Sequence, residues 1–168
     1  MNNTYLIGMM GSGKSQTGKA LAELLGCEFC DTDELIEKKH SLSVSEIFAS
    51  KGETWFREAE SEVLLELSQK MNQVVATGGG IILRSQNVEA MRDTGNVIYL
   101  EAAVDVLWEY VRGSTNRPLL GGENPEEQFR NIYESRRPLY EKSCKMKVVF
   151  NKENPSEVAK RISEILEK

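Results

Sequence analysis

The sequence predicts a three-layer α/β fold, in which helices cover both faces of a central five-stranded parallel sheet. Short apolar runs typical of buried strands alternate with longer segments whose apolar residues recur at helical spacing. This alternation indicates a parallel sheet with crossover helices. The second observation is the stretch Gly8–Ser15 (GMMGSGKS), a phosphate-binding loop motif that lies between the first predicted strand and the first predicted helix.

The predicted elements follow one another without an internal repeat or low-complexity tract, and a length of 168 residues fits one domain, residues 1–168. We expect strands near Thr4–Ile7, Glu28–Cys30, Val74–Ala76, Val97–Leu100 and Lys147–Phe150. We expect helices at Lys14–Leu25, Asp33–Lys39, Val44–Ser50, Glu53–Gln69, Ser85–Asp93, Asp105–Val111, Pro125–Tyr140 and Pro155–Glu167.

Two segments break the alternation. Residues 33–60 insert several helical pieces between the second and third strands. Residues 113–124 (GSTNRPLLGGEN) are too rich in Gly, Asn and Pro for a stable helix or strand, so we expect a mobile loop there. Arg117 within it favours a lid, over about residues 112–124, that closes and excludes water. A plain surface loop is the alternative.

Composition excludes several classes of protein. The net charge of −5 argues against a general nucleic-acid binder, so an anionic ligand must be held by local Arg, Lys and backbone N–H groups. No apolar run is long enough to span a bilayer. The first strand begins almost at once and leaves no room for a targeting peptide, from which we expect a cytoplasmic protein.

The cysteines and the histidine favour structural roles over redox or metal chemistry. Cys27 and Cys30 form a C-x-x-C pair that straddles a predicted strand, and Cys144 stands alone. We interpret all three as structural thiols, with a redox pair as the alternative. The single histidine, His40, lies in a polar stretch where we expect a surface position, and one imidazole argues against a multi-histidine metal site.

The phosphate loop carries the clearest chemistry. Its glycines allow backbone N–H groups to turn toward a polyphosphate, and the helix N-terminus adds partial positive charge. Lys14 can reach the terminal phosphates, and the Ser15 hydroxyl can ligate Mg²⁺. A chance match in a glycine-rich turn is the alternative.

Two carboxylates follow the second predicted strand, in Asp31-Thr32-Asp33. Ligands of open parallel sheets bind beyond the carboxyl ends of the strands. One carboxylate can therefore support Mg²⁺, and the other can orient or deprotonate an acceptor hydroxyl. Capping of the next helix by Asp33 is the alternative, and it accounts for only one of the two.

Further along, glycines and arginines form a second candidate group. Gly78–Gly80 follow the third strand and permit close backbone approach to a ligand, or else form a flexible turn. Arg57 could grip a carboxylate bidentately, but it could equally pair with Glu60 or Glu53 along its own helix. Arg136 lies late in a helix, where a solvated position is the alternative.

Taken together, these residues resemble the shikimate kinases. The match runs in order over nearly the whole chain. Its motifs are GMMGSGKS, D-T-D after the second strand, F-R-x-x-E around Arg57, G-G-G after the third strand, R-P-L-L from Arg117 and R-x-P-L-Y from Arg136.

The resemblance implies a P-loop kinase fold with a mobile lid. It implies transfer of the γ-phosphoryl group of ATP to the 3-hydroxyl of shikimate, which gives shikimate 3-phosphate and ADP in aromatic amino-acid biosynthesis. It also implies Mg²⁺ as cofactor and ATP and shikimate as the small-molecule partners. We expect a monomer with no nucleic-acid or membrane partner.

The resemblance further implies roles for individual residues. Catalytic roles fall to Lys14, Asp33 and Arg117, while Ser15 holds Mg²⁺ and Asp31 supports it through its water shell. The residues implied to bind ATP are Gly11, Ser12, Gly13, Lys14, Ser15, Gln16, Arg112, Arg117, Asn151 and Pro155, of which Arg112, Asn151 and Pro155 are assigned by position alone. The residues implied to bind shikimate are Asp33, Phe56, Arg57, Glu60, Gly78, Gly79, Gly80 and Arg136.

Two other functions stay open on the residues alone. One is a different P-loop small-molecule kinase, such as a gluconate or nucleoside monophosphate kinase, since paired Arg57 and Arg136 favour a carboxylate substrate without excluding gluconate. The other is a nucleotide-binding module that has lost catalysis. Such a module is expected to lose Lys14, Asp33 or Arg117, and all three are present.

Overall fold

The structure, a computed structural model that describes residues 2–167, contains a five-stranded parallel sheet. Neighbouring strands follow the order β2-β3-β1-β4-β5, and every paired strand runs parallel. The predicted fold class is therefore confirmed. The strands are β1 (Asn3–Ile7), β2 (Glu28–Asp31), β3 (Gln73–Ala76), β4 (Gly95–Glu101) and β5 (Met146–Val149).

All the predicted helices form, with ends within about three residues of the expected bounds. They are α1 (Lys14–Leu25), α2 (Thr32–His40), α3 (Val44–Lys51), α4 (Glu53–Ser68), α5 (Ser85–Thr94), α6 (Val104–Val111), α7 (Pro125–Ser143) and α8 (Pro155–Leu166). Two single 3₁₀ turns, η1 (Ile81–Leu83) and η2 (Pro118–Leu120), were not expected. The second one corrects the expectation that residues 113–124 hold no helical turn, because a proline at the first position sets its φ angle for such a turn.

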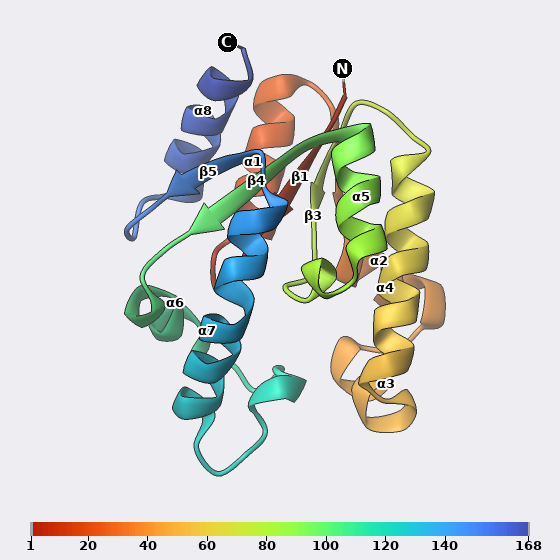
Figure 1. The fold of residues 1–168 in the computed structure, drawn as a ribbon, viewed down its shortest axis with the longest axis vertical. Helices are drawn as coiled ribbons and strands as arrows, with labels where there is room; N and C mark the ends of the chain where they lie inside the picture. The colour runs from red at the N-terminus through yellow and green to blue at the C-terminus, as the bar shows by residue number, and fades with distance from the viewer. Residues whose placement is uncertain (1, 168) are drawn as a thin grey trace.

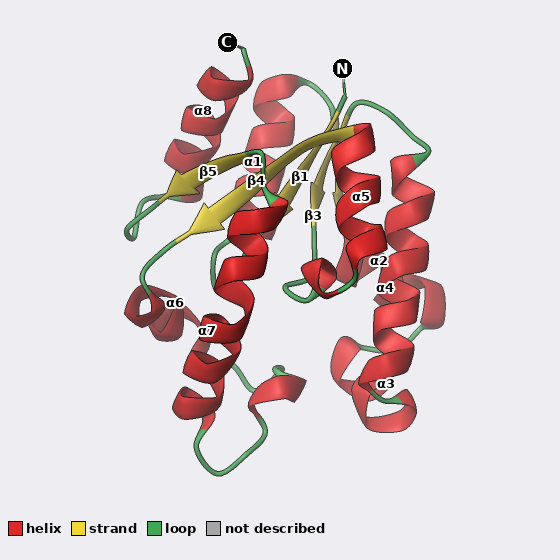
Figure 2. Cartoon of the chain, in the orientation of Figure 1, coloured by secondary structure: helices red, strands yellow, loops and turns green. Residues whose placement is uncertain are grey.

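The helices lie in two layers on the sheet. Helices α1 and α8 pack together on one face, and α5 and α7 lie on the other (Figures 1 and 2). The central strand β1 is sealed by both layers, and Tyr5, Leu6 and Ile7 have no exposed surface. Gly18 lets α1 approach β2 closely, since a methyl group there would lie 2.6 Å from the Phe29 ring. Because all the strands of this sandwich run parallel, they all end at the same edge.

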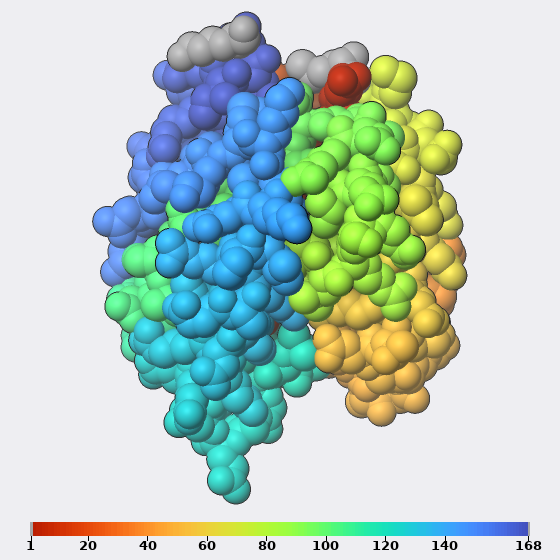
Figure 3. Space-filling model, viewed as in Figure 1, coloured from red at the N-terminus to blue at the C-terminus, as the bar shows by residue number. Residues whose placement is uncertain are grey.

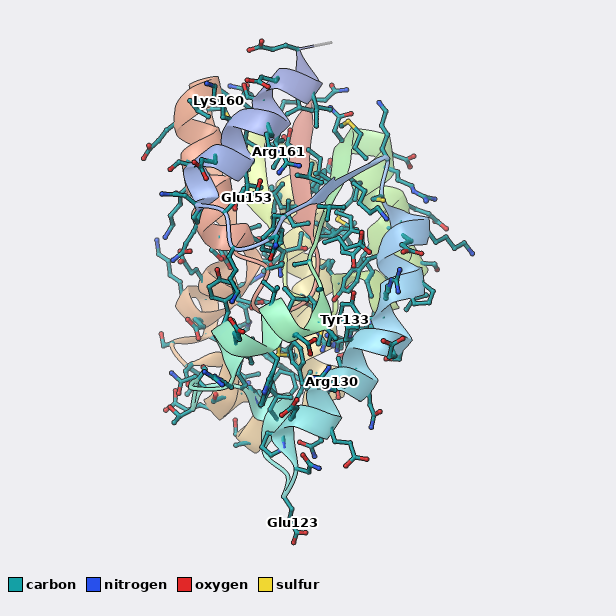
Figure 4. All side chains as sticks on the ribbon, turned by 90° about the vertical axis from the view of Figure 1, so that its left-hand side faces the viewer. Glu123, Arg130, Tyr133, Glu153, Lys160 and Arg161 are labelled. Atoms are coloured by element: carbon teal, nitrogen blue, oxygen red, sulfur yellow. The ribbon has the colours of Figure 1, made fainter. Side chains whose placement is uncertain are left out.

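Two segments extend beyond that edge. Helices α2 and α3 and the start of α4 form one projection, and residues 112–124 form the other (Figure 1). The two meet, because η2 packs against both α3 and α7, and their surfaces adjoin in the space-filling view (Figure 3). Glu123 marks the tip of the second projection, far from the sheet (Figure 4).

The thiols and the imidazole are placed by packing. The three cysteines carry no disulfide, and burial raises the pKa of the Cys30 thiol to about 11 and that of Cys27 above its usual value. The raised pKa values favour the structural interpretation over a redox pair, whose reactive thiol needs a lowered pKa. His40 is half-buried and packs edge-on against Trp55, with ring centroids 4.8 Å apart, so the expected surface position is only partly right. Within residues 2–167 no helix is both long and apolar enough to cross a membrane.

Candidate active site

The predicted site residues lie at the ends of three neighbouring strands. The phosphate loop follows β1, Asp31 ends β2, and Gly78–Gly80 follow β3 shortly after its last residue. Because β2, β3 and β1 are adjacent and parallel, these three segments meet at the carboxyl edge of the sheet.

The phosphate loop needs glycine at its turns. Gly8, Gly11 and Gly13 have φ angles of 151°, 85° and 73°, which L-residues rarely adopt. Two of these positions also have no room for a side chain. A methyl group at Gly8 would lie 2.7 Å from the Leu100 carbonyl oxygen, and one at Gly11 would lie 2.7 Å from Val111. Helix α1 begins directly after the loop without a side-chain cap, so its first N–H groups are available to an anion.

Lys14 is folded back onto the loop. Its Nζ donates hydrogen bonds to the carbonyl oxygens of Gly8, at 2.8 Å, and Met9, at 3.0 Å. Burial lowers the pKa of Lys14 to about 8, although the nearby carboxylates of Asp33 and Asp31 oppose that shift. An anion bound to the loop would favour the charged form of this side chain.

Ser15 and Asp31 lie together beside the loop. The Ser15 hydroxyl donates to Asp31 Oδ2 at 2.5 Å, while Asp31 Oδ1 accepts from the backbone N–H groups of Asp33, at 3.0 Å, and Glu34, at 3.3 Å. Asp31 is therefore the N-cap of α2, which corrects the idea that Asp33 would serve as the cap. The side chain of Asp33 is left free to face the site.

This pair of oxygen donors suits one kind of metal. No cluster of three or more His, Cys, Asp or Glu side chains arranged for a metal occurs in the described part of the chain. A hydroxyl and a carboxylate alone fit Mg²⁺, which keeps several waters and takes substrate phosphate oxygens as further ligands.

Asp33 and Glu60 face the same glycine. A methyl group at Gly78 would lie 2.1 Å from Glu60 Oε1 and 2.9 Å from Asp33 Oδ1. Both of these oxygens are buried, and neither has a hydrogen-bond partner among residues 2–167. Burial raises the pKa of Asp33 to about 7, helped by the charges of Glu60 and Asp31 and opposed by Lys14 and Arg57. A carboxyl group with such a pKa can accept a proton near neutral pH.

Two buried arginines border this carboxylate pair. Arg57 donates to Glu60 Oε2 at 2.8 Å and contacts Glu53 Oε1 at 3.2 Å, so the ion pair along its own helix exists. Arg57 nevertheless has only 8% of its surface exposed. Arg136 is 6% exposed, and no carboxylate within the described residues forms an ion pair with it. A buried guanidinium without a carboxylate ion-pair partner is suited to binding an anionic ligand.

The glycine loop packs against both guanidinium groups. A methyl group at Gly80 would lie 2.2 Å from Arg57 Nη1, and one at Gly79 would lie 3.5 Å from Arg136 Nη1. Only glycine at position 80 leaves room for Arg57 where it stands. The solvated alternative for Arg136 therefore does not describe this structure, whereas Gly79 and Gly80 do form a turn.

Two cavities open around these groups. The first, of about 390 Å³, is lined by the phosphate loop, Asp31, Asp33 and Arg117. The second, of about 400 Å³, is lined by Arg57, Glu60, Arg136 and again Asp33 and Arg117. The residues common to both are Met10, Asp33, Gly78, Gly79 and Arg117. Asp33 and Arg117 thus stand at the junction of the two cavities.

Most of the predicted binding residues line one of the two cavities. The first cavity includes Gly11, Ser12, Gly13, Lys14, Ser15, Gln16, Arg117 and Pro155, and the second includes Asp33, Phe56, Arg57, Glu60, Gly78, Gly79, Gly80 and Arg136. Arg112 and Asn151 line neither. Arg112 is exposed at the end of α6, and the exposed Asn151 donates its N–H to the Glu153 carboxylate at 2.9 Å.

Sequence reasoning did not identify several of the residues that line the cavities. Tyr110, Phe150 and Glu153 line the first cavity, and Glu153 is held by Arg161 at 2.6 Å beside α8 (Figure 4). Phe150 could have been found, because it directly follows a strand at the carboxyl edge. In the second cavity, Phe48 of α3 and Leu119 of the η2 turn come together only through packing.

Comparison with known proteins agrees with this geometry. A family model described as "Shikimate kinase" matches residues 10–167. A shikimate kinase from Symbiobacterium thermophilum is 42% identical over 168 residues, covering 99% of this chain and 95% of that protein. A shikimate kinase from Thermodesulfovibrio yellowstonii is 45% identical over 143 residues, covering 85% of this chain and 83% of that protein.

Solved structures give the same result. The shikimate kinase from Acinetobacter baumannii in complex with shikimate superposes with a TM-score of 0.96 at 38% identity, covering 99% of this chain and 93% of that one. The shikimate kinase from Aquifex aeolicus superposes with a TM-score of 0.86 at 39% identity, covering 98% of this chain and 96% of that one. The chain therefore belongs to the shikimate kinase family and has the activity of that family in the shikimate pathway of aromatic amino-acid biosynthesis.

Proposed function

We propose that the two cavities divide the substrates of the shikimate kinase reaction between them. ATP occupies the first cavity with its phosphates on the loop Gly8–Ser15, and shikimate occupies the second, so that the 3-hydroxyl meets the γ-phosphoryl group at the junction. The observation that carries the proposal is that Asp33 and Arg117 line both cavities. The shikimate bound in the A. baumannii relative supports it.

Shikimate is held by its carboxylate in this proposal. Arg136, buried and without a carboxylate partner in the described residues, supplies one guanidinium group, and Arg57 supplies the second from the opposite helix. Glu60 keeps Arg57 oriented through its 2.8 Å ion pair. Phe56, which is 3% exposed, packs beside them and limits the space open to the ring.

Proton transfer is assigned to Asp33. Its free, buried Oδ1 can accept the proton of the 3-hydroxyl as the oxygen attacks phosphorus, and a pKa of about 7 leaves a large ionised fraction at neutral pH. The oxygen–phosphorus bond to shikimate forms while the bond from the γ-phosphorus to ADP breaks. The proton then resides on Asp33.

Charge on the transferring group is balanced by cations from two directions. Lys14 exchanges its bonds to the Gly8 and Met9 carbonyl oxygens for phosphate oxygens, and Arg117 reaches the group from the lid. Ser15 and Asp31 would hold Mg²⁺, which supplies further neutralisation of the phosphates when bound. These groups position and stabilise, since phosphoryl transfer needs little covalent help.

The remaining assignments follow the same proposal. Residues 33–60 form the shikimate-binding insertion and residues 112–124 form the lid of a single domain. Pro155 lies at the nucleotide cavity, while roles for Arg112 and Asn151 at the adenine stay predictions. A monomeric state and a cytoplasmic location also stay predictions from the sequence.

The test is a coupled assay that detects ADP with shikimate, gluconate, a nucleoside monophosphate or no acceptor. We expect ADP release only with shikimate, and a product phosphorylated at the 3-hydroxyl by ³¹P NMR. The Asp33→Asn variant should lose at least about 10²-fold in kcat, the usual contribution of a positioned acid or base. Turnover that ignores shikimate, or an unimpaired Asp33→Asn variant, would contradict the proposal.

A further inference from the structure

The glycine loop is anchored at each of its carbonyl groups. The Gly78 oxygen accepts from the Ile81 N–H at 3.1 Å, and the Gly80 oxygen accepts from the Leu83 N–H at 3.0 Å, so both donors belong to the η1 turn that follows the loop. The Gly79 oxygen between them accepts instead from the hydroxyl of Tyr140, at 2.5 Å. This bond joins the loop to a residue 61 positions away, on α7.

Tyr140 is itself held firmly. It has no exposed surface, and its ring stacks on Tyr99 of β4 with centroids 5.2 Å apart and an interplanar angle of 23°. Burial raises the pKa of Tyr140 to about 12. The hydroxyl therefore keeps its proton at every physiological pH and always acts as the donor to Gly79.

A bond to one side of a peptide group controls its other side. The peptide unit is planar and trans, so the Gly79 C=O and the Gly80 N–H point in opposite directions. The Gly80 N–H has no hydrogen-bond partner in the described residues, and Gly80 lines the second cavity against the Arg57 guanidinium. A hydroxyl that holds the carbonyl from behind thus sets where this free N–H points.

The same helix also carries Arg136, one turn before Tyr140. Residues four apart lie on one face of a helix, so α7 presents the guanidinium and the hydroxyl to the glycine loop together. A peptide flanked by two glycines has few steric limits on its rotation. The loop consequently depends on this outside anchor for the orientation of its central peptide.

We propose that Tyr140 is a positioning residue for shikimate, whose hydroxyl orients the Gly79–Gly80 peptide so that the Gly80 N–H donates to the substrate carboxylate between Arg57 and Arg136. The proposal rests on the placement of shikimate in the second cavity. It differs from a purely structural role, in which the hydroxyl would only satisfy a buried carbonyl.

The test compares Tyr140→Phe with Tyr133→Phe. The first variant keeps the ring that stacks on Tyr99 and removes only the hydroxyl. Tyr133 is the matched control, because it lies on the same helix (Figure 4), is buried, and donates to the Ala102 carbonyl at 3.4 Å. It lines neither cavity.

For Tyr140→Phe we expect the KM for shikimate to rise about three- to tenfold, the effect of one hydrogen bond. The KM for ATP and kcat should stay within about twofold, because the phosphate loop is not touched. Tyr133→Phe should leave all three constants within the same limit. Calorimetric titration of each variant with shikimate should show the same loss of affinity for Tyr140→Phe alone.

The outcomes separate the two ideas. A wild-type chain that releases no ADP with shikimate overturns the proposed function and this inference with it. A wild-type chain that is active, beside a Tyr140→Phe variant with an unchanged KM for shikimate, overturns the inference alone. Equal rises in both KM values, or equal effects of the two variants, also overturn it, because a general loss of packing would then be the cause.

Discussion

Replacement of Glu60 by glutamine should move the pH dependence of the enzyme to lower pH. Glu60 Oε1 and Asp33 Oδ1 lie 2.1 and 2.9 Å from one point above Gly78, so the two oxygens are at most about 5 Å apart. Carboxylates at this distance titrate as a coupled pair, in which each charge raises the pKa of the other. The Glu60→Gln variant removes one charge and keeps the shape.

The size of the shift follows from Coulomb's law. Two unit charges about 5 Å apart at an effective dielectric constant of about 20 repel by about 3 kcal/mol, or about two pKa units. Burial also raises the pKa of Glu60, which reduces its mean charge and the repulsion. We therefore expect the pKa of Asp33 to fall by about one to two units from its value of about 7.

The assay is kcat/KM for shikimate between about pH 5 and pH 9, at saturating ATP. A base must be ionised to work, so the wild-type rate should fall as pH drops below about 7, while the Glu60→Gln rate should persist to about pH 5 to 6. Glu53→Gln is the matched control, because Glu53 also pairs with Arg57 but is half exposed and lines neither cavity. An acid limb that stays in place in Glu60→Gln, or moves as far in Glu53→Gln, would refute the reasoning.

Two further predictions concern the substrates. Arg136→Ala should raise the KM for shikimate by about 30-fold or more, since truncating one partner of a buried charge pair costs about 2 to 5 kcal/mol, and steady-state kinetics should find the KM for ATP unchanged. A comparable rise in both KM values would argue against a carboxylate partner. Tyr110→Ala should raise the KM for ATP about fivefold through lost contact in the first cavity, and Arg112→Ala less than about twofold. The reverse ranking would place Arg112 at the nucleotide after all.

Local chemistry is what the sequence by itself determined. The phosphate loop could be recognised because Gly8, Gly11 and Gly13 adopt φ angles that few other residues tolerate. The glycines in the sequence therefore indicate the conformation of the loop. Helix ends were also predictable, because the residues that cap a helix are close neighbours in the sequence. The capping box of Asn154 and Glu157 at the start of α8 involves only neighbouring residues.

Strand and helix alternation likewise determined the parallel sheet and brought the strand ends to one edge. Asp31, the glycine loop after β3 and the phosphate loop were therefore expected together, and they are together. The sequence pattern could not predict that Asp31 rather than Asp33 caps α2, because both carboxylates lie close to the start of that helix in the chain.

Only the tertiary structure decided the relations between distant residues. The proximity of Asp33 to Glu60 depends on how α4 packs against the loop after β3, and the raised pKa of Asp33 depends on burial that no spacing reveals. The absence of Arg112 and Asn151 from both cavities, the contact of η2 with α3, and the bond from Tyr140 to Gly79 also depend on tertiary packing. Burial and long-range contact arise from the packing of whole elements, and a linear pattern records only which residues are neighbours along the chain.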